Sequence, residues 1–131
     1  MGFVYVKVTV HGSKASKPVE MLVGTGSTYI VLGQELIEAL GLVETPYSVK
    51  LTLADGREVE AKLFLAEAEA EGRKGPTFVL QLDTPKPLLG VYALETLGFK
   101  VNPRTGSLEE IAPEGGYLLM GWIKSRLKEG M

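Results

Sequence analysis

Valine occupies every second position of residues 4–10, with polar or aromatic residues between the valines. A period of two residues is typical of a strand that buries one face. A polar turn is predicted over residues 11–17, and residues 19–23 then predict the antiparallel partner of the first strand. The β-branched and apolar residues 28–32 predict a further short strand.

Two short helices are predicted between the strands. Gln34–Leu40 places its apolar side chains on one helical face and is followed by Gly41, a residue suited to a left-handed C-cap. Val91–Leu97 shows the same pattern and is followed by Gly98. The two segments correspond residue by residue, with Leu36, Leu40, Gly41 and Leu42 matching Ala93, Leu97, Gly98 and Phe99. The chain therefore reads as two related halves.

A long hairpin is predicted in the middle of the chain. Residues 49–53 and 59–65 alternate between apolar and polar positions, and Asp55-Gly56 supplies a tight turn between them. The apolar phase changes after residue 65, which predicts a bulge or a strand end near Phe64. Residues 77–82 and 88–90 predict two more strands, and residues 102–106 a turn. Such short helices among many strands favour an all-β barrel or sandwich over a doubly wound α/β sheet.

Composition narrows the classes of protein and partner. The 131 residues suit one globular domain, and the absence of cysteine excludes disulfide-rich and zinc-thiolate classes. We expect no cofactor and no metal. The net charge of −2 and the scattered lysines and arginines argue against a nucleic-acid partner. The alternating residues 1–10 lack the apolar run of a signal peptide or membrane span, so we expect a cytoplasmic protein with no membrane partner.

The sequence Gly24-Thr25-Gly26 after a predicted strand also occurs in nucleotide-binding loops. Here Tyr29 stands where the dinucleotide pattern needs its third glycine, and the lysine of a phosphate loop is missing. A short strand is predicted to follow, so the free amides of a helix N-terminus are not available to phosphate. These features argue against nucleotide binding.

Two motifs and their order carry a resemblance to a known family. Residues 21–32 read Met-Leu-Val-Gly-Thr-Gly-Ser-Thr-Tyr-Ile-Val-Leu, and residues 87–91 read Pro-Leu-Leu-Gly-Val before the second helix. This resembles the retropepsin-like (clan AA) aspartic proteases, whose active-site signature is apolar-apolar-Asp-Thr-Gly-Ala/Ser and whose second landmark is two apolar residues and a glycine leading into a helix. The Asp55-Gly56 turn lies where the flap hairpin of that family would be.

The resemblance implies an all-β, retropepsin-like acid-protease barrel with one lobe per chain. It covers residues 1–111 as the protease domain and leaves residues 112–131 as a C-terminal segment, expected to be a dimer-interface strand or a small packing helix of the same domain. It also implies a homodimer that binds an extended peptide or protein substrate in a cleft.

Gly24 departs from the family at the position of the catalytic aspartate. Retropepsin-like enzymes place one aspartate from each chain side by side, and the shared proton lets one carboxyl act as base and the other as acid. Gly24 supplies neither group, so we expect an aspartic endopeptidase scaffold that is inactive in this sequence. Two alternatives stay open: a non-catalytic peptide-binding or assembly module on the same fold, and an unrelated small β-barrel.

The resemblance also implies a role for each of the remaining site residues. Thr25 would hydrogen-bond across the dimer, Gly26 would allow close backbone approach, and Ser27 would orient the missing carboxylate. The substrate-binding candidates are Ser27, Asp55, Gly56, Leu89 and Gly90.

The other candidate catalytic side chains have structural explanations. Asp55 and Asp83 are the only aspartates of the chain, and both are expected in turns. His11 is expected to be a solvated surface residue in the first turn, without a nucleophile beside it.

Overall fold

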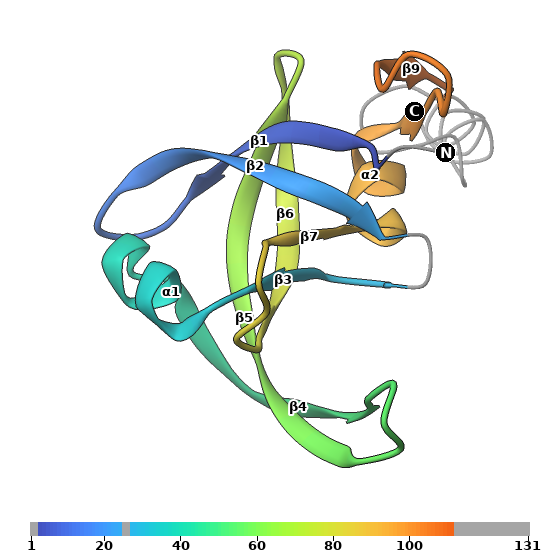
Figure 1. The fold of residues 1–131 in the computed structure, drawn as a ribbon. Helices are drawn as coiled ribbons and strands as arrows, with labels where there is room; N and C mark the ends of the chain where they lie inside the picture. Colours follow the sequence, from blue (N-terminus) through green and yellow to red (C-terminus); the bar gives the residue numbers. More distant parts are fainter. Residues whose placement is uncertain (1–2, 25–26, 112–131) are drawn as a thin grey trace, which may run out of the picture.

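A computed structural model describes residues 3–24 and 27–111, which form a strongly curved sheet with two short helices (Figure 1). The elements in chain order are β1 Tyr5–His11, β2 Ser16–Gly24, β3 Ile30–Leu32, α1 Gln34–Leu40, β4 Val43–Thr52, β5 Glu58–Ala70, β6 Arg73–Gln81, β7 Leu88–Gly90, α2 Val91–Leu97, β8 Phe99–Val101 and β9 Leu108–Glu110. No helix within these ranges is long and apolar enough to cross a membrane. The predicted C-terminal segment, 112–131, lies outside the described residues.

The sheet closes on itself to form a barrel. Its strand order is β1-β2-β7-β3-β6-β5-β4, and β1 pairs in addition with β5 through Thr9, Val10 and His11. Six strands thereby make a ring, and β4 follows β5 outside it. Closure leaves few unpaired strand edges. The all-β barrel with two short helices that the sequence predicts is therefore observed.

His11 takes part in this closure, which corrects its prediction as a solvated turn residue. It is the last residue of β1, and its side chain is only 24% exposed. The His11 Nδ1 atom lies 2.6 Å from Ser16 Oγ, and its Nε2 atom lies 2.8 Å from Glu69 Oε1. The imidazole thus joins β1 to β2 and to β5. The sequence places Glu69 on a remote strand, so the contact could not be read from local pattern.

The main hydrophobic core fills the barrel and extends under both helices. The strands contribute side chains that are at most 1% exposed, including Val8, Val10, Met21, Ile30 and Val79. Each helix adds residues of its apolar face, Ile37 and Leu40 from α1 and Ala93, Leu94 and Leu97 from α2. Burial of this apolar surface is the main favourable term in the stability of such a domain.

The change of apolar phase near Phe64 has a different cause from the one predicted. The pairing of β5 with β6 runs without interruption from Leu63 to Ala70, so β5 neither bulges nor ends there. Leu63 is buried in a second, smaller cluster, whereas its neighbour Phe64 is buried in the main core. The strand therefore buries one face first and then the other. The register shift lies in the partner strand β4, between Glu44 and Ser48.

The two halves predicted from the sequence share their backbone geometry. Gly33 precedes α1 with φ −75° and ψ 162°, and Gly90 precedes α2 with φ −82° and ψ 156°. Gly41 and Gly98 end the helices in the left-handed region, with φ 69° and 80°. Glycine adopts this conformation without the steric penalty that a Cβ atom brings. Both helices therefore begin and end at the residues that the pattern predicts.

Leu63 and Leu65 of β5 offer a direct test of the phase change. We expect Leu63→Ala, at a site 6% exposed, to lower the free energy of unfolding by about 2 kcal/mol or more, as buried leucines generally do. Leu65→Ala, at a site 40% exposed, should lower it by less than half as much. Urea denaturation of both variants makes the comparison. Equal losses would contradict a change of buried face at residue 64.

Candidate functional site

Gly24 ends β2 at the centre of the sheet. It pairs with Gly90 of the parallel strand β7, and its carbonyl oxygen accepts a hydrogen bond of 3.0 Å from the N–H of Ser27. This bond holds Ser27 close to the end of β2. Thr25 and Gly26, the other two residues predicted for the catalytic loop, lie outside the described residues.

The backbone at Gly24 does not require glycine. Its φ angle lies outside the left-handed region, and among the described residues a Cβ atom added there would meet only Ser27 Cβ, at 3.5 Å. This is an ordinary van der Waals distance, so a Cβ atom fits at this position. The backbone at position 24 accordingly does not demand a glycine.

Gly90 contrasts with its pairing partner Gly24. A Cβ atom on Gly90 would lie 2.4 Å from the carbonyl carbon and oxygen of Thr28, which no real structure allows. The following two residues bind the same segment, because the N–H groups of Val91 and Tyr92 donate to the carbonyl oxygens of Ser27 and Thr28 at 3.1 and 3.2 Å. Because Gly90 has no side chain, its backbone can lie directly against that of Thr28, and this contact positions Ser27 and Thr28.

The predicted substrate-binding residues around the loop differ in what they expose. Leu89 is 1% exposed and belongs to the main core, so its side chain packs and offers a ligand no surface. Ser27 is half-buried, and its hydroxyl donates to the carbonyl oxygen of Tyr29 at 2.9 Å. Since that proton is already engaged, Ser27 would have to rotate to donate to a carboxylate at position 24.

Asp55 and Gly56 form the tip of the β4–β5 hairpin, as predicted. Asp55 Oδ1 accepts a bond of 3.0 Å from the Arg57 N–H, and Asp55 Oδ2 accepts one of 2.7 Å from Arg57 Nε. These bonds lower the pKa of the Asp55 carboxyl, the backbone N–H having the largest effect. Gly56 has a φ of 88°, which the turn requires. The Asp55 carboxylate is thus engaged in holding its turn.

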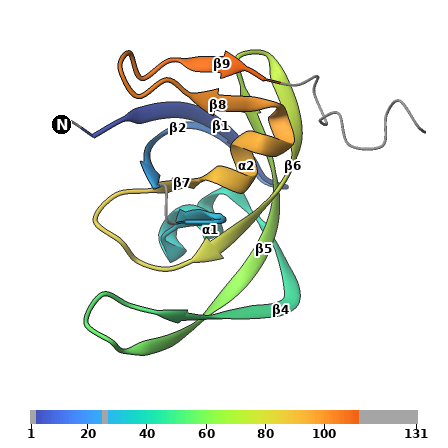
Figure 2. The same cartoon turned by 90° about the vertical axis from the view of Figure 1, so that its right-hand side faces the viewer.

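The hairpin and the end of β2 lie on the same side of the barrel. Both ribbon views show the tip of the β4–β5 hairpin and the carboxyl end of β2 on this side (Figures 1 and 2).

Asp83 has a structural role that its turn prediction did not include. Its Oδ1 atom accepts a bond of 3.2 Å from the N–H of Gln34, the first residue of α1. A Cβ atom on Gly33 would lie 2.9 Å from the same oxygen, so the absence of a side chain at Gly33 makes room for the carboxylate. A carboxylate at this end of a helix is favoured by the helix dipole. Asp83 is therefore a capping residue and is engaged away from Gly24.

A patch of apolar side chains lies at the base of the hairpin. Its buried members are Val31, Ala61, Leu63 and Leu80, and half-buried residues pack on them, namely Tyr29, Val49, Leu51, Phe78, Leu82 and Leu88. The Tyr29 ring stands edge-on to Phe78 and Tyr92, with centroids 6.4 and 6.5 Å away. The sequence leaves the inward register of this hairpin open by one residue. In the structure, Ala61 and Leu63 of β5 lie on this side.

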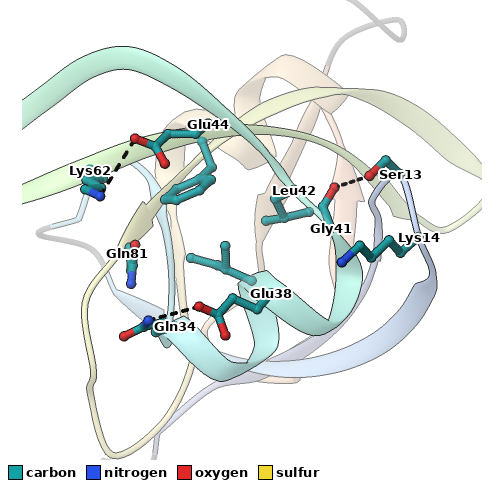
Figure 3. A pocket seen from close by; sticks show the side chains of 11 residues that line it. Ser13, Lys14, Gln34, Glu38, Gly41, Leu42, Glu44, Lys62 and Gln81 are labelled. Atoms are coloured by element: carbon teal, nitrogen blue, oxygen red, sulfur yellow. Dashed lines mark hydrogen bonds and ion pairs between the residues drawn. The ribbon is translucent and has the colours of Figure 1, made fainter.

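A cavity of about 390 Å³ has a largely polar lining. It lies between α1 and the β4–β5 pair, and Figure 3 shows its lining. Its polar groups largely satisfy one another: Gln34 Nε2 donates to Glu38 Oε1 at 2.9 Å, and Lys62 Nζ lies 3.8 Å from Glu44 Oε2. Among the described residues, no group of three or more acidic, histidine or cysteine side chains could hold a metal ion.

Comparison with known proteins agrees with this geometry. Residues 6–93 match the profile of the family described as Aspartyl protease. The fold is similar to that of EIAV protease complexed with the inhibitor HBY-793, with a TM-score of 0.63 and 24% sequence identity. That match covers 77% of this chain and 93% of the viral one. No curated protein sequence matches the chain.

We expect alanine substitutions at the paired glycines, Gly24 and Gly90, to differ in their effect on the free energy of unfolding. Gly90→Ala forces a Cβ atom against backbone and should lower the free energy of unfolding by about 1–3 kcal/mol or more, the range of overpacking. Gly24→Ala meets only an ordinary contact, so we expect a change within about 0.5 kcal/mol. Thermal denaturation of the two variants measures both. A destabilising Gly24→Ala would show that this backbone position demands glycine.

Proposed function

The chain belongs to the aspartyl protease family, and from that premise we propose that two copies form a peptide-binding cleft whose catalytic carboxyls are replaced by Gly24. The fold is a retropepsin-like lobe. The observation that carries the proposal is the open Cβ position of Gly24, at the end of β2 and beside the close contact of Gly90 with Thr28.

A second copy supplies what one lobe lacks. Aspartic peptide hydrolysis needs two carboxyls that share a proton, one to take a proton from water and one to protonate the leaving amine. One chain carries a single 24–27 loop, so two loops must meet to make such a pair. In the proposed homodimer the Gly24-Thr25-Gly26 loops meet beneath the two hairpins.

The apolar patch at the base of the hairpin supports a peptide as the ligand. Tyr29, Leu82 and Leu88 are half-buried and form part of this patch. Half-buried apolar side chains gain by excluding water, and an extended peptide can cover them with alternate side chains while its backbone pairs with strands. We therefore assign an extended peptide with apolar side chains to this surface.

Loss of the carboxyls removes the chemistry but leaves this surface intact. Gly24 can neither activate water nor protonate an amine, so the chain as it stands binds such a peptide without cleaving it. This joins the two leading interpretations of the sequence: the scaffold is that of a protease, and its present activity is peptide binding.

Restoring the carboxyl tests the proposal. Gly24→Asp should cleave an extended apolar peptide between about pH 3 and pH 7, because a shared proton requires one ionised and one neutral carboxyl. The rate should exceed that of the unmodified chain by about 10²-fold or more. Gly24→Asn is the matched control, since it has the same shape and cannot exchange a proton at these pH values.

Binding of the same peptide to the unmodified chain is measured by calorimetry. Binding without cleavage is the expected result. If folded Gly24→Asp neither cleaves the peptide nor binds a transition-state inhibitor of aspartic proteases, the assignment of Gly24 to the catalytic position is wrong. If the unmodified chain also fails to bind the peptide, the peptide-cleft assignment fails with it.

A further inference from the structure

An apolar groove of about 210 Å³ lies on the side of the barrel that carries α2 and the β8–β9 hairpin (Figure 2). Val23 of β2, Val91 and Leu94 of α2, and Phe99 and Val101 of β8 line it. The two charged side chains at the groove, Glu95 and Lys100, are exposed and of opposite sign. The groove therefore suits an apolar occupant and offers nothing that selects a charged one.

The groove is incompletely covered by the described residues. Val91 is 38% exposed and Ile111, which also lines it, is 46% exposed. Contiguous apolar surface on a soluble protein marks a place where something else packs. A cavity of roughly 150 Å³ already holds a benzene ring, so this groove has room for an aromatic side chain.

The chain itself leads out of this groove. Ile111 is held there by its N–H, which donates to the carbonyl oxygen of Gly98 at 2.8 Å. The sequence continues for 20 residues, and residues 117–123 read Tyr-Leu-Leu-Met-Gly-Trp-Ile, the longest apolar run after the barrel. The five residues between can span up to about 17 Å, enough to turn back over the groove.

We propose that residues 117–123 dock in this groove of their own chain, with their large apolar side chains against Val91, Val101 and Ile111. The short connection favours this occupant over any free partner, because a tether of a few residues holds its end at a local concentration of about the millimolar range. The residues that line the groove differ from those of the hairpin patch assigned to peptide, so separate variants test the two surfaces.

Trp122 makes the docking measurable, because it is the only tryptophan of the chain. In the full-length protein we expect its fluorescence emission to be blue-shifted relative to free N-acetyltryptophanamide. We also expect iodide to quench the Trp122 fluorescence less efficiently than that of the free compound, by a factor of about two or more. The reason is that a charged quencher does not enter an apolar groove.

Matched variants connect the signal to the groove. Val91→Lys puts a charge on its rim and should shift the Trp122 emission to the red and raise quenching toward that of the free indole. Val43→Lys is the control, since Val43 is an exposed valine of β4 that lies outside the groove and should leave the signal unchanged. Ile111→Lys provides a second groove variant should Val91→Lys lose its circular dichroism spectrum.

Three outcomes would overturn the proposal. Solvent-like emission from the unmodified chain shows that Trp122 is not docked. Emission unchanged in both groove variants shows that it is docked elsewhere. Protection that disappears on dilution, in step with dissociation of a dimer in sedimentation velocity, makes the segment of a second copy the occupant. Protection that is independent of concentration and lost in the groove variants supports docking within one chain.

Discussion

The three-residue strand β7 is the constraint on which the rest of the structure depends. It lies between β2, with which it pairs in parallel, and β3, with which it pairs in antiparallel fashion. Without it, β2 would have no neighbour on that side and the ring of six strands would open. Its last residue, Gly90, lies so close to Thr28 that no side chain fits between them. Gly90 thus lies where the sheet, the backbone of Thr28 and the start of α2 meet.

At the candidate site, the residue that the fold requires and the residue at the catalytic position of the family are two different glycines. Gly90 is required by a backbone contact, whereas Gly24, opposite it in the pairing, has an open Cβ position and an unstrained backbone. The scaffold that places a residue at position 24 is therefore complete without a catalytic group. The family's fold and the apolar patch at the base of the hairpin are therefore compatible with the absence of a carboxyl at position 24, as the proposed function requires.

Much of this fold is predictable from local patterns in the sequence. The helices were predictable to the residue because Gly41 and Gly98 mark their ends, and the β4–β5 hairpin because Asp55-Gly56 suits its turn. Features that depend on remote contacts were not predictable. The bond of His11 to Glu69, the capping of α1 by Asp83 and the switch of buried face at Phe64 each require knowing which strands are neighbours.

The central claim is that this lobe is half of a two-fold site. Its most direct test is the molar mass of the full-length chain in solution, measured by sedimentation equilibrium over a wide range of concentrations. The account predicts a species of twice the 14.1 kDa mass of one chain, dissociating on dilution. A mass of one chain at every concentration, including the highest that stays soluble, would contradict it.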